Sequence, residues 1–416
     1  MRILWVLAIQ PDPLRPIVTG GDGPFYIEVA QSFANGTGLS TCHSSDCSDD
    51  PARRAPITTV GPLYPAFLSI FFAIWPDMAT ALQASRIADA FVITLAILAV
   101  YWIALQVAGR RAGLVAAAVM AIDLRFIVEI GNAHTEPLTT LLLLAGVAAT
   151  LWALDGDANC RWLLAGFMLG LASLARPVML VAPLVISALL ALTRPRAPIA
   201  RAWLWLPTLC AITIAPWLVR NYVVLGTLTF AEGGAAHFWL GAQSAGRWEG
   251  QQSYVDSIEN LPQEPEGNPT SSTYLRDTIK TITAAPRRYV ALLLAKLGRA
   301  YAQPIGTVIL GGESIKDATV AWLNGERSLS DVIRIRQFVP KLYIYVFHYT
   351  TIGLALIALA ICRRRWKEWL LPALVIVSIS GAYTLLTIIP RYLFPIMPLY
   401  IVLAAMLIPR RGGNAV

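Results

Sequence analysis

The chain has 416 residues, of which 56% are hydrophobic and only 14% are charged, and its formal net charge is +8. Soluble domains carry roughly 25% charged residues, whereas this chain repeats apolar runs near the roughly 20 residues that cross a bilayer. We therefore predict an all-α polytopic membrane protein. The runs do not alternate as the strands of a membrane β-barrel do, and the arginines cluster in short loops, which argues against nucleic-acid binding.

Residues 1–9 form an apolar opening that is too short to span a membrane and has no small-residue cleavage site. Two interpretations stay open. Either the true start of the chain lies upstream of Met1, or the first transmembrane helix is truncated.

A short external helix is predicted within residues 20–36, because Pro24 suits a first helical turn and the pair Asn35-Gly36 suits a helix end. One stripe of this amphipathic helix carries Phe25, Tyr26, Val29 and Phe33. Asp22 lies at the head of that stripe. It either caps the helix N-terminus, as aspartate does well, or serves a membrane enzyme as a base.

A polar loop over residues 37–60 holds two of the five cysteines, Cys42 and Cys47. We favour a disulfide between them, which requires the loop to lie outside the cytoplasm. The segment Cys42-His43-Asp46-Cys47 is the alternative as a metal site, but its spacing matches no strong zinc pattern.

Apolar runs then mark the helices. Residues 61–75, with prolines near both ends, suit an interfacial helix. Membrane spans are predicted at residues 81–107, 112–126, 137–154, 162–174, 177–192, 202–219, 341–361, 369–389 and 393–408. Between them lies a long polar segment, residues 223–340, predicted as an external loop that contains a basic amphipathic stretch at 286–303. We thus divide the chain into an N-terminal membrane module (1–222), the long external loop (223–340) and C-terminal membrane helices (341–416).

Charge assigns the loops to two sides. If each apolar run crosses the membrane once, all the basic loops lie on the same side. The positive-inside rule identifies that side as the cytoplasm. These loops carry Arg110, Arg111, Arg161, Arg194, Arg196, Arg201, Arg363, Arg364, Arg365, Lys367, Arg410 and Arg411. The alternate loops then lie outside, and they hold Asp22, Glu136, Arg176, Arg220 and Arg391. This arrangement predicts about ten helices, counting the incomplete first one, in the inner (plasma) membrane with a site that faces the periplasm or exterior.

Three ionisable residues, Glu129, His134 and Glu136, lie in or beside a short outer loop. Ionisable groups at membrane depth are costly and usually face a cavity or a partner. The alternative is a solvated loop in which Glu136 begins a helix beside Pro137, where acids are favoured.

Arg176, Arg220 and Arg391 each lie at the outer end of a span, and Lys296 adds positive charge on the same side. Arginine can bind phosphate through two nitrogens, so these residues could hold an anionic lipid phosphate. Snorkelling to the headgroups is the alternative for any single arginine. The chain has no phosphate-binding nucleotide loop and no nucleotide fingerprint, so a lipid-carried donor fits better than a nucleotide sugar.

Seven motifs in order resemble GT-C type membrane glycosyltransferases, and more narrowly the family 39-like group of bacterial protein mannosyltransferases and aminoarabinose transferases. They are Asp22-Gly23-Pro24-Phe25-Tyr26, Gly61-Pro62-Leu63-Tyr64-Pro65, Gly109-Arg110-Arg111-Ala112-Gly113, His134-Thr135-Glu136-Pro137-Leu138, Ser173-Leu174-Ala175-Arg176-Pro177, Pro216-Trp217-Leu218-Val219-Arg220-Asn221-Tyr222 and Pro390-Arg391-Tyr392. The resemblance implies a polyprenyl-phosphate-linked sugar donor and an inverting transfer at the outer face. The acceptor would be an envelope glycolipid, polysaccharide or protein.

By position, the resemblance implies that Asp22 is the catalytic base and Glu136 a second acidic site residue. Arg176, Arg220 and Arg391 would bind the donor phosphate. Tyr26, Tyr64, His134 and Lys296 are expected to line the substrate pocket. Many relatives carry a second acid where this chain has Gly23, so no cofactor is certain and a divalent metal is possible. A transporter or flippase for a lipid-linked or small anionic solute is the alternative, although no internal repeat of the kind common in transporters is evident.

Overall fold

The structure is a computed structural model that describes residues 1–15, 22–42, 54–156, 158–193, 203–231, 233–242, 270–307 and 309–409. These residues are mainly helical. Their one sheet consists of two short antiparallel strands, β1 (Ser40–Thr41) and β2 (Ala55–Pro56), with Ser40 opposite Pro56. The predicted all-α class is confirmed.

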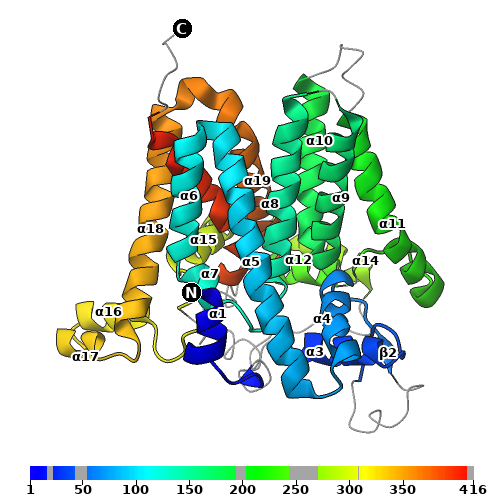
Figure 1. Ribbon diagram of the computed structural model, residues 1–416, viewed down its shortest axis with the longest axis horizontal. Helices are drawn as coiled ribbons and strands as arrows, with labels where there is room; N and C mark the ends of the chain where they lie inside the picture. Colours follow the sequence, from blue (N-terminus) through cyan, green and yellow to red (C-terminus); the bar gives the residue numbers. More distant parts are fainter. Residues whose placement is uncertain are drawn as a thin grey trace.

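Long apolar helices form an upright bundle (Figure 1). Its helices are α5 (Met78–Ala108), α6 (Arg110–Ile122), α8 (Glu136–Leu154), α9 (Asn159–Ala175), α10 (Val181–Thr193), α11 (Trp205–Leu225), α18 (Phe338–Ile361), α19 (Trp366–Leu385) and α20 (Met397–Ala404). Each predicted span coincides with one of them. Six helical segments in the described part of the chain are long and apolar enough to cross a membrane by themselves. The chain is therefore a polytopic membrane protein, as predicted.

Small residues let the central helices pack closely. Because burial of apolar surface gives little driving force inside a membrane, helices associate there through such close packing. A Cβ atom on Gly146 of α8 would meet the Leu169 side chain of α9 at 2.6 Å. A Cβ atom on Gly166 of α9 would meet the Leu206 carbonyl of α11 at 2.3 Å. Glycine at these positions brings α8, α9 and α11 into one layer.

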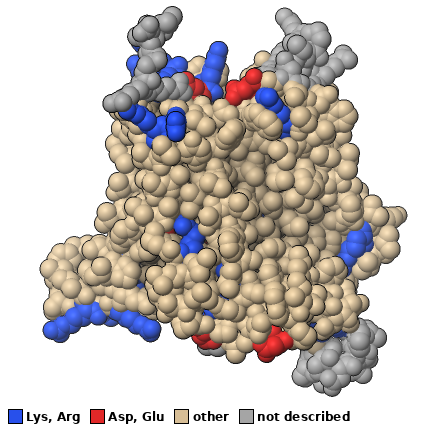
Figure 2. Space-filling model, in the orientation of Figure 1, with Lys and Arg blue, Asp and Glu red and all other residues tan. Residues whose placement is uncertain are grey.

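The two ends of the bundle carry different segments (Figure 1). The α5–α6 connection and the α18–α19 connection lie at the upper end in this view. The short helices α3 (Gly23–Ala34), α4 (Leu63–Ile74) and α7 (Arg125–Val128) lie at the lower end, with the N-terminal α1 (Arg2–Leu4) and η1 (Trp5–Ile9). Figure 2 shows Lys and Arg side chains near the upper end and also in a row along the lower left edge. Arg194, Arg196, Arg201, Arg410 and Arg411 lie outside the described residues, and the cellular side of each end stays a prediction.

The segment 223–340, expected as a long loop, contains five helices in its described part. They are α12 (Gly234–Ala242), α14 (Ser271–Ala284), α15 (Pro286–Ala302), α16 (Ile315–Leu323) and α17 (Leu329–Ile333). Of these, α15 coincides with the predicted basic amphipathic stretch. Of the others, α12 is only nine residues long, and α14, α16 and α17 are short and interrupted by polar residues, so a search for long apolar runs does not find them. The division of the chain at residues 222 and 340 stays a prediction.

The first-loop helix α3 has Pro24 in its first turn and ends before Asn35, both as predicted, and Gly36 follows it at φ 78°, a conformation that favours glycine. It packs on α4, where the rings of Tyr26 and Tyr64 meet edge to face with centroids 5.1 Å apart. The predicted apolar stripe is correct for Tyr26 and Val29, but Phe33 is exposed. This pair of helices covers the lower end of the bundle beside the start of α8.

Candidate functional site

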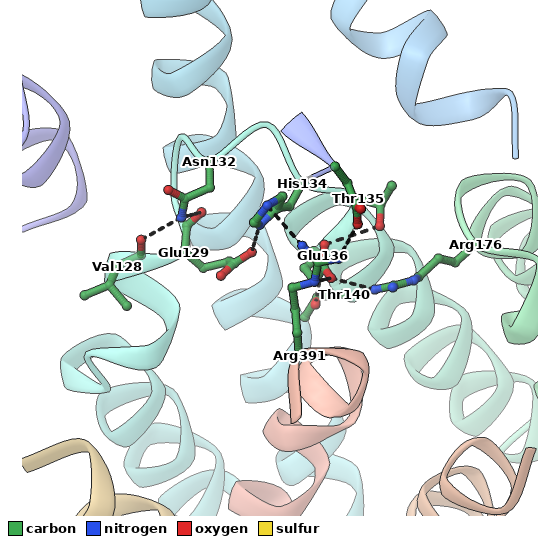
Figure 3. A network of polar contacts seen from close by, with 10 residues as sticks. Val128, Glu129, Asn132, His134, Thr135, Glu136, Thr140, Arg176 and Arg391 are labelled. Atoms are coloured by element: carbon green, nitrogen blue, oxygen red, sulfur yellow. Dashed lines mark hydrogen bonds and ion pairs between the residues drawn. The ribbon is translucent and has the colours of Figure 1, made fainter. Parts of the chain in front are cut away.

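Acids and arginines from distant parts of the chain meet where α3, the α7–α8 loop, the end of α9 and η7 (Pro390–Ile396) come together (Figure 3). Glu136, the first residue of α8, is only 1% exposed. Its Oε1 accepts a hydrogen bond from Arg176 Nη1 at 2.7 Å, and Arg391 Nε lies 3.1 Å from the same oxygen. A buried carboxylate is costly unless it is paired, so Glu136 is stabilised by two guanidinium groups.

Asp22 joins this cluster from the protein surface. It occupies the N-cap position of α3, but its side chain makes no capping hydrogen bond, so the interpretation of Asp22 as a side-chain cap is wrong. Its carboxylate instead accepts a hydrogen bond from Arg391 Nη2. Because the Asp22 side chain is half exposed while Glu136 is buried, the cluster has one acid that faces outward and one that faces inward.

The loop between α7 and α8 supplies the other side of the cluster (Figure 3). Asn132 Nδ2 donates to the Val128 and Glu129 carbonyls, both at 3.0 Å, and closes the loop. Ala133 has φ 53°, in the left-handed region that costs a non-glycine residue roughly 1–2 kcal/mol. This turn brings His134 Nδ1 to 2.8 Å from Glu129 Oε1, and His134 Nε2 to 3.1 Å from Arg391 Nη1.

Aromatic rings surround Arg176. Its guanidinium carbon lies 4.7 Å from the ring centroid of Tyr392 and 5.9 Å from that of Tyr383, and these two rings stack with centroids 4.9 Å apart. A cation over an aromatic face is stabilised electrostatically. Arg176 is therefore held from one side by Glu136 and from another by rings. Burial raises the pKa of the nearby Tyr26 hydroxyl, which consequently stays protonated.

Two predicted site residues, Arg220 and Lys296, donate hydrogen bonds to backbone carbonyls. Arg220 Nη1 donates to the Ile57 carbonyl at 3.0 Å and Nη2 to the Leu39 carbonyl at 3.3 Å, so Arg220 ties α11 to the first loop. Lys296 Nζ donates to the carbonyls of Gly241, Thr384 and Leu386 at 2.7–2.9 Å. These contacts stabilise the last turn of α19, whose carbonyls have no partner within the helix.

The predicted Cys42–Cys47 pair can be followed only in part. Cys42 is disulfide-bonded, and its backbone N–H donates to Glu28. Cys47 lies outside the described residues, as do His43 and Asp46, so the pairing stays a prediction.

Sequence reasoning missed Asp89 of α5 and Tyr383 of α19. Asp89 is 3% exposed and accepts a hydrogen bond from the Gly131 backbone. Asp89 Oδ1, Glu129 Oε2 and the Tyr64 hydroxyl are buried without a hydrogen-bond partner among the described residues. A carboxylate inside an apolar span was the signal that could have found Asp89. For Tyr383, one tyrosine in an apolar run gives no such signal.

Glu129, His134 and Glu136 also have the composition of a metal site. One ligand atom from each lies within 4.8 Å of the others, and two carboxylates with an imidazole suit a divalent transition metal. Glu136 Oε2 accepts one hydrogen bond, at 3.3 Å from Thr135, and Glu129 Oε2 has no partner among the described residues. The residues therefore fit a metal ion in type and spacing, but Arg391 takes the single lone pair that a neutral His134 ring offers and lies beside Glu136, so a metal would have to displace it.

Fold and site together define a polytopic membrane protein with a carboxylate–arginine cluster at one end of its helix bundle. Residues 59–219 match the family model described as dolichyl-phosphate-mannose-protein mannosyltransferase. The match confirms the resemblance to family 39-like GT-C glycosyltransferases over that range, which includes Tyr64, His134, Glu136 and Arg176. A search among curated proteins found no match to this chain.

Solved structures with a similar chain path have low sequence identity. The Archaeoglobus fulgidus oligosaccharyltransferase in complex with Zn and sulfate has a TM-score of 0.48 and 15% identity over 93% of this chain and 44% of that one. The same organism's oligosaccharyltransferase AglB in complex with an inhibitory peptide and a dolichol-phosphate has a TM-score of 0.47 and 16% identity, over 92% of this chain and 46% of that one. ArnT from Cupriavidus metallidurans bound to undecaprenyl phosphate has a TM-score of 0.42 and 12% identity, over 92% of this chain and 73% of that one. This chain spans about half the length of the archaeal proteins, and these similarities assign it no activity.

Proposed function

We propose that this protein is a membrane glycosyltransferase that moves a sugar from a polyprenyl-phosphate donor to an envelope acceptor. The observation that carries the proposal is the outward-facing Asp22, joined through Arg391 to the buried pair of Glu136 and Arg176. Such a cluster offers a base next to phosphate-binding cations at the end of a membrane bundle. The family match over residues 59–219 supports the same class of donor.

In this reaction an acceptor hydroxyl attacks the anomeric carbon of the sugar while Asp22 takes the hydroxyl proton. The bond between the anomeric carbon and the phosphate oxygen breaks, and the electron pair leaves with the polyprenyl phosphate, so the anomeric centre inverts. Positioned cations stabilise the charge that develops on the leaving phosphate. We assign this role to Arg391 and Arg176, because arginine presents several donors in a planar fork. Arg391 has more N–H donors than the one that contacts Asp22, so it can keep this contact while it binds the phosphate.

The remaining assignments concern the edges of the site. Tyr26 and Tyr64 line the pocket from α3 and α4, while Arg220 and Lys296 act on the donor through the segments that they hold. A divalent metal held by Glu129, His134 and Glu136 would add positive charge near the phosphate. We place the site at the periplasmic or outer face of the inner (plasma) membrane, with membrane lipid around the bundle and a glycolipid, polysaccharide or protein as acceptor.

The direct test compares the cell-envelope glycans of a gene-deletion strain and its parent by mass spectrometry. The expected result is the loss of one sugar from one envelope component and the accumulation of its polyprenyl-phosphate donor. Unchanged glycans together with solute counterflow in proteoliposomes would show a transporter instead. Production of the Asp22→Asn variant in the deletion strain separates a catalytic from a scaffolding role, because a catalytic protein would then fail to restore the glycan whereas a scaffold would restore it.

The pH dependence of transfer is expected to report His134. Burial lowers the pKa of His134, but Glu129 outweighs this effect and raises it above its ordinary value of 6.5. Only the neutral ring can accept the hydrogen bond from Arg391, and a raised pKa means that the neutral ring exists only at higher pH. The kcat/KM for transfer should therefore fall as pH drops through a transition above 6.5. Measured pH profiles should lose this transition in the His134→Gln variant, and its persistence there would contradict the assignment.

A further inference from the structure

Glu129 lies behind the cluster, where it contacts neither Asp22 nor a surface that an acceptor could reach. Its side chain is buried, and Oε1 lies 2.8 Å from His134 Nδ1. On the other side of the same ring, His134 Nε2 lies 3.1 Å from Arg391 Nη1. The imidazole is thus held between a carboxylate and a guanidinium (Figure 3).

The chemistry of these groups determines which ring nitrogen of His134 carries the proton. A guanidinium nitrogen can only donate, so His134 Nε2 must accept from Arg391. The neutral ring then carries its proton on Nδ1 and donates it to the Glu129 carboxylate. The opposite tautomer would place an N–H of His134 against an N–H of Arg391, so both contacts are hydrogen bonds only when Glu129 accepts.

This tautomer also orients Arg391. Its Nη1 is hydrogen-bonded to His134 and its Nη2 to Asp22, while Nε lies 3.1 Å from Glu136 Oε1 as an ion pair without a hydrogen bond. Because a guanidinium is planar and rigid, a hydrogen bond that holds Nη1 at His134 restricts where Nη2 points. The direction of the contact with Asp22 therefore depends on a residue that Asp22 does not touch.

We propose that Glu129 is a positioning residue, which selects the tautomer of His134 and thereby fixes the Arg391 guanidinium against Asp22. The proposal rests on the proposed function for its effect on transfer, while its structural part can be tested without transfer. Second-layer acceptors that set a histidine tautomer are common behind functional histidines. The left-handed Ala133 supports this role, since it turns His134 back onto Glu129.

The structural part is tested by ¹⁵N NMR of histidine-labelled full-length protein in nanodiscs at alkaline pH, with the His134 signals assigned by their loss in His134→Gln. We expect a protonated Nδ1 and an unprotonated Nε2 in the wild type. Glu129→Gln should keep this pattern, because its amide oxygen still accepts, whereas Glu129→Ala should lose it. A protonated Nε2 in the wild type, or an unchanged tautomer in Glu129→Ala, would overturn the inference.

The functional part is tested by a double-mutant cycle on kcat/KM for sugar transfer. Glu129→Ala should lower kcat/KM about tenfold or more, and Glu129→Gln should lower it less. In His134→Gln the amide oxygen of the glutamine can accept the hydrogen bond from Arg391 without the help of residue 129. In that background Glu129→Ala should therefore lower kcat/KM by less than about twofold. An equal cost in both backgrounds would overturn the inference. If the NMR pattern is found but the wild type transfers no sugar, the proposed function fails while the tautomer assignment stands.

Discussion

Asp22→Asn is expected to lower sugar transfer by at least about 100-fold, the usual contribution of a positioned general base. Asparagine has nearly the same shape and can still contact Arg391 through its amide oxygen, so the fold should be unaffected. The measurement is transfer from a polyprenyl-phosphate sugar by purified protein in nanodiscs, with thermal unfolding as the check on folding. A glutamate at position 22 restores the base on a longer side chain and is expected to recover part of the activity.

The matched control is Asp77→Asn. Asp77 also lies at the N-cap of a helix, α5, where its carboxylate accepts a hydrogen bond from the Thr80 backbone at 2.8 Å. Asparagine is an equally good N-cap, so this variant should retain full transfer activity and stability. Wild-type transfer by Asp22→Asn would remove Asp22 from the role of base and leave the glycosyltransferase class to be tested by the deletion strain.

Arg391→Gln should produce the second large effect, because one guanidinium contacts Asp22, His134 and the buried Glu136. Loss of a donor that stabilises developing charge costs roughly 100- to 1,000-fold in kcat, and we expect a loss of this size in transfer. The free energy of unfolding should fall by only about 1–3 kcal/mol, because Arg176 still pairs with Glu136. Enzyme assays and thermal unfolding of the same preparation measure both effects.

Arg391→Lys separates charge from geometry. Lysine keeps the positive charge but is a point charge that cannot reach three partners in one plane, so we expect activity between those of Arg391→Gln and the wild type. Arg334→Gln, which changes an exposed arginine directly after α17, is the control and should be active. Full activity in Arg391→Lys would mean that the planar fork is not needed.

The membrane helices could be predicted because the information is local. An apolar run of bilayer length must satisfy its backbone hydrogen bonds within itself, and so it forms a helix. Helix α3 was predictable for a similar reason, since Pro24 and Asn35-Gly36 mark its ends within a few residues. The helices of segment 223–340 were missed because α14, α16 and α17 are short and amphipathic, and so carry no long apolar run.

The sequence by itself determined the class of protein, the order of its membrane helices and which charged residues lie at one end of the bundle. Only the tertiary structure decided which of these charges meet. Asp22 and Arg391 are 369 positions apart and pair directly, whereas Arg220 and Lys296, predicted for the same phosphate, hold backbone carbonyls. The reason is physical: hydrophobicity acts residue by residue along the chain, but an ion pair forms only where helix packing brings two side chains within about 4 Å.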